Sequence, residues 1–264
     1  MIMKNILSVF LTAAAISTSI AAAPDWNKPT EFKAANIQHK DGVFTFSGRS
    51  VLYSRSAMIV DTAKKYTVKL KMRAVPGTDP ALAYAGFQPI SKDGHYLLTI
   101  HLRQEKNTAA KLLQDAKTGD TQIIISTPAR WISSMARNCW YVAMGSDGAP
   151  ASVPHFDVIR VKDVGEDPEG LAIELVKPLK KDYPAGTNIC FHSDGPGMNT
   201  IANGVKLTAE WQEFTGSVQG LSDIPGRNAW WKSTHRARLM FMLLPVAGSK
   251  NIGMEVKDIV VTEE

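Results

Sequence analysis

Apolar and polar residues alternate strictly over residues 66–74, a stretch that ends at the turn formed by Pro76 and Gly77. Because successive side chains of a β-strand point to opposite faces, this period of two predicts a strand with one buried and one solvated face. The buried set is Tyr66, Val68, Leu70 and Met72, and the solvated set is Thr67, Lys69, Lys71 and Arg73. Residues 236–245 are apolar on both faces, which predicts a strand in the centre of a sheet.

Other stretches of the chain also favour strands. Residues 253–264 alternate until Lys257 and Asp258, where the register slips as it does at a β-bulge. Helical periodicity is weak, and its best stretch, residues 107–117, covers roughly three turns. Many short strands separated by Gly and Pro predict an all-β chain, folded as an antiparallel sandwich or barrel.

The order of these segments resembles that of the jelly-roll carbohydrate-binding modules of bacterial secreted proteins, whose sandwich is also called galactose-binding-like. The resemblance covers residues 30–101 and 200–264 and implies an antiparallel jelly-roll sandwich. It rests on "GVFTFSGRSVLYS", "KKYTVKLKMRA", "AYAGFQPISKDG", "AEWQEFTGSVQG", "RARLMFMLLP" and "MEVKDIVVTE".

The interval between these two parts has a different pattern and resembles small all-β modules of bacterial surface and phage tail proteins. In those modules a Gly-Asp-Thr strand opens the unit and a Pro-Ala-Gly-Thr turn precedes its last strand, as at residues 119–121 and 184–187 here. We therefore expect a small β module inserted into the sandwich, with residues 113 and 193 close together. The expected organisation is a signal peptide at 1–23, the first part of the sandwich at 24–113, the inserted module at 114–192 and the second part of the sandwich at 193–264.

The start of the chain has the layout of a secretory signal peptide. An apolar run over residues 6–20 is followed by small residues at 21–23 and by Pro24. The run is shorter than the ~20 residues that span a bilayer, so cleavage near Ala23 is favoured over a short membrane anchor. No later segment is long enough to span. The mature protein is thus expected to be secreted, periplasmic or at the cell surface.

The charge balance is mildly basic, with 30 Lys and Arg against 25 Asp and Glu. The basic residues form short clusters, which solvated strand faces explain better than a nucleic-acid interface does. The stretch "KPLKKDYPAGT", residues 177–187, is interpreted as a turn between two strands with its lysines exposed. A polyanion-binding patch remains the alternative if Lys177, Lys180 and Lys181 converge in space with Arg236 and Arg238.

Two cysteines, Cys139 and Cys190, lie in apolar stretches near the ends of the inserted module. In an exported chain a pair of cysteines favours a disulfide. Two buried free thiols are the first alternative. The second alternative is a zinc site formed by the two cysteines and His192, but the sequence shows no evident fourth ligand for it.

Motifs of catalysis are missing, because no G-x-S-x-G elbow, H-E-x-x-H helix or P-loop occurs. His192, Ser193 and Asp194 are adjacent in an extended stretch, where they would point to opposite faces and could not form a triad. His95 and His101, six strand residues apart, would lie about 20 Å from each other and could not chelate one metal. No catalytic residue is assigned, and an enzyme is not expected.

Aromatic residues are the sugar-binding signal that remains. Carbohydrate sites place flat rings against the apolar faces of sugars, with a few polar groups in a cleft. Trp230 and Trp231 lie in a polar loop and form the candidate platform, although one ring could instead plug the end of the sandwich. The polar partners are Arg227, Asn228 and His235, and the secondary aromatic candidates are Tyr53 and Tyr84.

The family resemblance also bears on metals. In the modules that this chain resembles, a structural calcium often joins the first and last strands, and Asp258 would be the matching ligand. The family commonly has two acids at that place, whereas this chain has Lys257 and Asp258. No other cofactor is expected. The expected function is non-catalytic binding of a polysaccharide or cell-surface glycan, and the alternative is a structural or assembly protein without a glycan site.

Overall fold

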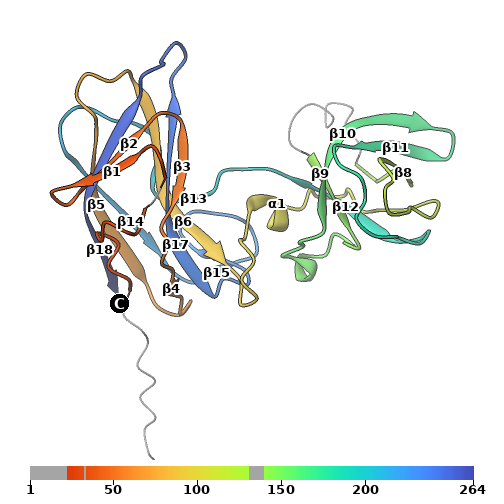
Figure 1. The fold of residues 1–264 in the computed structure, drawn as a ribbon. Helices are drawn as coiled ribbons and strands as arrows, with labels where there is room; N and C mark the ends of the chain where they lie inside the picture. Colours follow the sequence, from red (N-terminus) through yellow and green to blue (C-terminus); the bar gives the residue numbers. More distant parts are fainter. Residues whose placement is uncertain (1–22, 33, 131–139) are drawn as a thin grey trace, which may run out of the picture.

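The computed structural model describes residues 23–32, 34–130 and 140–264. They form two bodies of β-structure joined by connecting segments, one of which contains a short helix (Figure 1). The predicted signal peptide, apart from Ala23, lies outside the described residues and stays a prediction. None of the helices in the described ranges has the length and apolarity needed to cross a bilayer.

The first sheet of the larger body has five antiparallel strands. In spatial order they are β1 (Ile37–Lys40), β2 (Val43–Ser47), β18 (Gly253–Glu263), β5 (Tyr66–Ala74) and β14 (Gln212–Val218). On β5 the four predicted apolar side chains are buried and the intervening polar ones are not. The strict alternation therefore predicted both the strand and its buried face.

The second sheet packs against the first to make the sandwich. Its strands are β13 (Met198–Lys206), β6 (Ala81–Ile90), β17 (Arg236–Pro245) and β3 (Ser50–Tyr53), with β4 (Met58–Ile59) paired to the start of β17. A short parallel pair, β15 (Leu221–Ser222) and β16 (Trp230–Trp231), lies outside both sheets. β17 lies between β6 and β3, which confirms its predicted central position.

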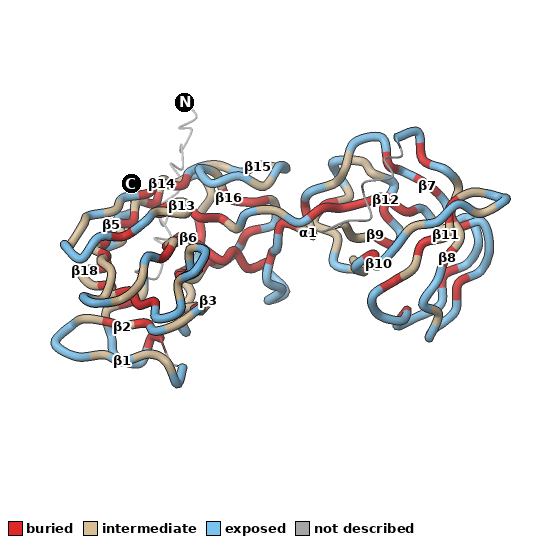
Figure 2. Tube along the Cα trace, turned by 90° about the horizontal axis from the view of Figure 1, so that it is seen from above, coloured by how far each residue is buried: buried red, intermediate tan, exposed pale blue. Residues whose placement is uncertain are grey.

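Phenylalanine rings join the two sheets in the core. Phe46 of β2 and Phe241 of β17 stack with centroids 5.8 Å apart, and Phe32 packs on Phe241 at 5.4 Å. All three side chains are buried, and buried residues recur along the strands of both bodies (Figure 2). Each such burial stabilises the fold by about 1.5–3 kcal/mol relative to exposure. The predicted all-β antiparallel sandwich is confirmed.

The predicted bulge in the last strand is present. The pairing of β18 with β5 shifts register between Lys257 and Val260, and Asp258 has a φ of 53°. The side chain of Asn27 satisfies the backbone there, because its Nδ2 donates to Ile259 O at 2.8 Å and its Oδ1 accepts from Ile259 N at 2.9 Å.

The smaller body is a six-stranded antiparallel sheet with a core of its own. In spatial order its strands are β7 (Ala110–Lys111), β12 (Asn188–Ser193), β9 (Trp140–Met144), β10 (Val158–Asp167), β11 (Gly170–Leu175) and β8 (Gln122–Ile125). A 3-10 turn, η2 (Pro150–Ser152), precedes β10.

Residues 107–117, the best helical stretch of the sequence, are not helical. They contain β7 and isolated bridges instead. Ala110 and Leu112 are buried in the core of the small body while Lys111 between them is exposed. Packing against β12 thus selects a period of two over the weak helical period.

The small body is inserted between two neighbouring strands of the sandwich. The chain leaves at the end of β6 and returns at the start of β13, and these strands pair antiparallel with Met198 opposite Phe87. The outgoing segment contains the one-turn helix α1 (Thr99–Leu102). Outgoing and returning segments meet at a bridge between Gln104 and His192. β7 lies before the predicted boundary at 114, and the division of the chain into these four segments stays a prediction.

Residues 177–187 connect β11 to β12, as the interpretation of "KPLKKDYPAGT" predicted. Thr187 N donates to Pro184 O at 3.1 Å, and Gly186 has a φ of 82°, which closes the turn. The lysines of this connection are exposed, while Leu179 and Tyr183 are buried and hold it to the small body.

Candidate ligand-binding site

The two tryptophans expected to form an exposed platform are buried. Trp230 and Trp231 are 0% and 1% exposed. Trp230 packs edge-on against Tyr66 at 5.7 Å and against Phe87 at 5.1 Å. The expectation of solvent-facing rings is therefore wrong, because β16 turns the loop inward and its rings close one end of the sandwich core.

The predicted polar partners do not surround those rings. Arg227 is exposed, and its carbonyl accepts a hydrogen bond from Thr200 Oγ1 at 2.7 Å. Asn228 is exposed and lines a separate pocket beside Thr200. His235 is exposed, and its backbone continues the pairing of β17 through His235 N and Ile90 O.

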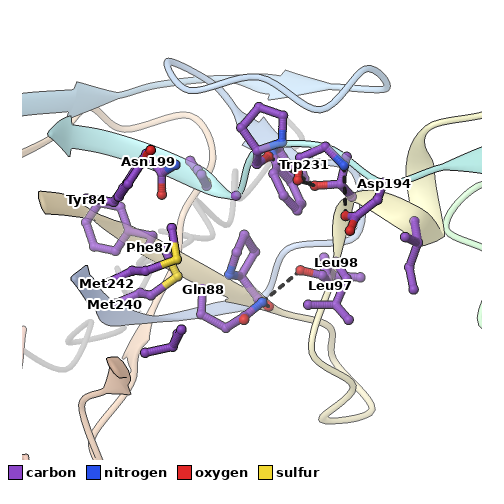
Figure 3. A pocket seen from close by; sticks show the side chains of 18 of the residues that line it. Tyr84, Phe87, Gln88, Leu97, Leu98, Asp194, Asn199, Trp231, Met240 and Met242 are labelled. Carbon is purple, nitrogen blue, oxygen red and sulfur yellow. Dashed lines mark hydrogen bonds between the residues drawn. The ribbon is translucent and has the colours of Figure 1, made fainter. Parts of the chain in front are cut away.

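Three of the predicted aromatic residues meet at a different place. Tyr53, Tyr84 and Trp231 line a pocket of about 590 Å³ on the side of the β13-β6-β17-β3 sheet that faces away from the core. We call it the outer-face pocket. Figure 3 shows Tyr84, Met240 and Met242 at one end and Leu97, Leu98 and Asp194 at the other. Its walls therefore come from the sandwich and from the segments leading to the small body.

Strand alternation on β17 explains which side chains reach the pocket. Leu239, Phe241 and Leu243 point into the core, so Met240 and Met242 point outward. Met240 lies opposite Tyr53 of β3, and Met242 lies opposite Tyr84 of β6. Two tyrosine–methionine pairs on adjoining strands thus form the floor of the pocket.

The pocket also presents polar groups. Asn199 is buried, its Nδ2 donates to Asn203 Oδ1 at 3.2 Å, and its Oδ1 has no hydrogen-bond partner in the described structure. Gln88 Nε2 donates to Leu97 O at 2.8 Å, which holds the Leu97 wall to the sheet. A buried acceptor without a partner is costly, and a ligand or water hydroxyl would satisfy it.

A second wall, residues 194–197, is held by α1. Thr99 Oγ1 donates to the carbonyls of Gly195 at 3.2 Å and Pro196 at 3.0 Å, and Arg103 Nη1 reaches Asp194 O at 3.3 Å. These bonds set the position of a loop that would otherwise be free to move.

The sequence missed Asn199, Gln88 and the outward methionines. Only the methionines had a partial indication in the sequence. Residues 236–245 are apolar on both faces, which indicated that the outer face of this strand is covered. Nothing local showed that the linking segments would provide the cover.

The basic residues that could have formed one polyanion patch are divided between two pockets. Lys177 and Lys180 line a pocket of the small body, and Arg236 and Arg238 line a pocket of the sandwich. Lys181 pairs with Asp157 at 2.8 Å.

The proposed calcium ligand has another partner. Asp258 Oδ2 lies 3.0 Å from Lys71 Nζ, so the expected calcium ligand forms an ion pair with a lysine of β5, and Lys257 stands where the family commonly has the second acid. In the part of the chain that the structure describes, no group of three or more His, Cys, Asp or Glu side chains is arranged to hold a metal ion.

Cys190 is buried beside Thr108, and burial raises the pKa of its thiol. Cys139 lies outside the described residues. The predicted disulfide, and the zinc alternative that shares Cys139, stay predictions.

Four histidines gather where the two bodies meet. His95 and His101 both contact Phe156, with ring centroids at 4.7 and 5.0 Å. They lie much closer than the roughly 20 Å expected along a strand, since the chain turns into α1 instead of continuing extended. His155 and His192 complete the group.

Burial dominates the protonation of this group. Burial, followed by the positive charge that the neighbouring His192 can carry, lowers the pKa of His101 from 6.5 to about 4. The pKa values of His155 and His192 are also lowered, first by burial. His192 Nδ1 donates to Ile100 O at 2.7 Å, and its buried Nε2 has no partner in the described structure. All three rings therefore favour the neutral form.

Comparisons with known proteins add little to this picture. No family model matches the chain, and no curated protein matches it. Among solved structures, one titled "CBM4 structure and function" is aligned over 89% of this chain and 80% of its own, with 12% identity and a TM-score of 0.29. So weak a similarity carries no argument about ligand or activity.

Proposed function

We propose that the protein is an exported, non-catalytic carbohydrate-binding protein that holds a polysaccharide in the outer-face pocket. One observation carries the proposal: Tyr53 and Tyr84 stand beside the outward methionines in a pocket that also contains the unpartnered acceptor Asn199 Oδ1. Export rests on the signal-peptide layout of residues 1–23.

Sugars suit such a pocket for a physical reason. The ring hydrogens of a sugar form an apolar face that packs on tyrosine rings and methionine, and its hydroxyls donate to amide oxygens. The volume of about 590 Å³ lies within the usual range for small-ligand sites. The floor of the site stands on strands of a sheet, which hold it more rigidly than loops would.

An assembly role is the second candidate. The burial of both tryptophans favours it, and so do Leu221 of β15 and Ile224 just after it, which are 57% and 74% exposed. Exposed apolar groups of this kind mark protein contacts when they form a patch.

Affinity electrophoresis on a panel of plant, algal and bacterial polysaccharides tests the proposal. We expect at least one polysaccharide to retard the wild type, and Tyr84→Ala to weaken the binding by about tenfold, the equivalent of one aromatic contact. Trp211→Ala is the matched control, because Trp211 stacks with Arg73 and Lys257 on the other sheet.

Two results would contradict the proposal. If no polysaccharide retards the wild type, the assembly role is the better explanation. If Tyr84→Ala and Trp211→Ala bind equally well, the glycan site lies elsewhere than in the outer-face pocket.

A further inference from the structure

A second pocket lies on the same outer face of the sheet, farther toward the start of β17. It has a volume of about 230 Å³ and is lined by three arginines together with Tyr96. We call it the arginine pocket; its arginines are Arg55, Arg236 and Arg238.

The positive charge of this pocket is not neutralised by the described residues. Among the arginines of the described ranges, ion pairs involve Arg73 and Arg103 and none of these three. No carboxylate lines the pocket. Arg238 Nε is buried and, within the described structure, has no hydrogen-bond partner. A buried charged donor without a partner is costly, and an anion would satisfy it.

Arg238 is held in place before any ligand arrives. Its guanidinium lies 4.2 Å from the ring centroids of both Tyr53 and Tyr96, so the two rings enclose it. Cation–π contacts of this kind fix the plane of the guanidinium. Arg236 lies near the turn at Gly94, since a Cβ atom added to Gly94 would be 3.8 Å from Arg236 Nη2. Preorganised guanidinium groups lose little conformational entropy when they form bidentate hydrogen bonds with a carboxylate or sulfate.

The arginine pocket adjoins the outer-face pocket. Arg236, Arg238, Met240 and Met242 occupy alternate positions of β17 and so share one face. Tyr53 lines the outer-face pocket, and its ring stacks on Arg238 of the arginine pocket. Two residues of strand span roughly 7 Å, which is comparable to the length of a sugar unit.

We infer that the arginine pocket binds the carboxylate or sulfate of an acidic polysaccharide whose neighbouring sugars occupy the outer-face pocket. The inference rests on the proposed function and names its substrate class. A nucleic acid fits less well, because phosphate recognition uses basic residues along an extended surface, whereas these arginines converge on one small pocket beside an apolar one.

Isothermal titration calorimetry with oligosaccharides of equal length tests the inference on the intact mature protein. The probes are an oligogalacturonate, a sulfated galactan oligosaccharide, a neutral galactan oligosaccharide and single-stranded oligothymidylate. We expect one of the acidic sugars to bind at least about tenfold more tightly than the neutral one, because the neutral sugar cannot form charge-assisted hydrogen bonds with the arginines. The tighter of the two acidic probes identifies the group as carboxylate or sulfate. Its binding should weaken between 50 and 500 mM salt, roughly where screening of exposed charge sets in, while neutral binding should not.

The decisive variant is Arg55→Gln combined with Arg236→Gln, which removes two charges and leaves the Tyr53–Arg238 stack intact. Its affinity for the acidic sugar should fall by about tenfold or more, while its affinity for the neutral sugar should not change. The control is Arg49→Gln combined with Lys206→Gln, which removes the same charge from exposed positions lining neither pocket. Arg238→Lys keeps the charge but loses the planar fork, and should also weaken acidic binding.

The outcomes separate this inference from the proposed function. Equal binding of acidic and neutral sugars, or equal losses in the two double variants, overturns the inference and leaves glycan binding standing. Acidic binding that depends on the arginines but not on Tyr84 overturns the inference as stated, because the neighbouring sugars would then lie outside the outer-face pocket. Oligothymidylate binding as tight as that of the acidic sugars overturns it, and binding of no sugar at all overturns both.

Discussion

The imidazole rings of His155 and His192 lie 6.4 Å apart between their centroids. His192 belongs to β12 and bonds to Ile100 of α1, so this pair marks the junction between the small body and the segment that leaves the sandwich. Protonating both rings would place two like charges in a mostly buried environment.

Stability should therefore fall in mild acid. The folded-state pKa values of His101, His155 and His192 are lowered, so the unfolded chain binds more protons below its own pKa near 6.5. The stability contribution is fully present above pH 6.5 and is lost as the pH falls toward about 4. Glu105 and Asp157 oppose the loss, and Lys181 adds to it.

Thermal unfolding between pH 4 and 7 checks this prediction. The slope of Tm against pH should be smaller in a His101→Gln, His192→Gln variant than in the wild type. Identical slopes would show that carboxylates, not these histidines, control the acid response.

Trp230 should behave as a core residue. Trp230→Ala removes a buried ring that packs on Tyr66 and Phe87, and we expect a loss of about 3–5 kcal/mol in the free energy of unfolding. Urea denaturation measures it, with Trp211→Ala as control, because Trp211 is only partly buried. A loss below about 1 kcal/mol would mean that the ring is not packed as described.

The amide of Asn27 should matter to the last strand. Asn27→Ala leaves both backbone groups of the buried Ile259 without their partner, and we expect a cost of about 1–3 kcal/mol. Asn36→Ala is a suitable comparison, since the Asn36 bond to Ser47 O is exposed. Equal unfolding midpoints for the two variants in urea would contradict the prediction.

The thiol of Cys190 should react slowly in the folded protein. It is buried and burial raises its pKa, so little thiolate is available to an alkylating reagent. Mass spectrometry should find Cys190 unmodified under native conditions and labelled in denaturant without reductant. Labelling that requires a reductant would instead support the predicted Cys139–Cys190 disulfide.

The sandwich should fold without the small body. Ser193 N bonds to Arg103 O at 3.0 Å, so a short Gly-Ser linker can replace residues 104–193 and leave β6 paired with β13. We expect cooperative urea unfolding of the shortened protein. A gradual, non-cooperative transition would show that the two bodies depend on each other for stability.

The sequence by itself determined the features that depend on neighbours in the chain. The period of two in residues 66–74 and the apolar character of residues 236–245 predicted β5 and the central place of β17. The register shift at Lys257 and the turn at residues 184–186 were also predicted from residues adjacent in the chain. Each rests on backbone geometry that a few consecutive residues decide.

Only the tertiary structure decided what those elements meet. Whether Trp230 faces water depends on Tyr66 and Phe87, which are distant in the chain, and the polar composition of its loop gave no sign of them. The same holds for the outer-face pocket, whose Tyr84 and Asn199 become neighbours when β6 pairs with β13. Burial and pocket shape arise from pairing between remote segments, and a local hydrophobic period does not encode that pairing.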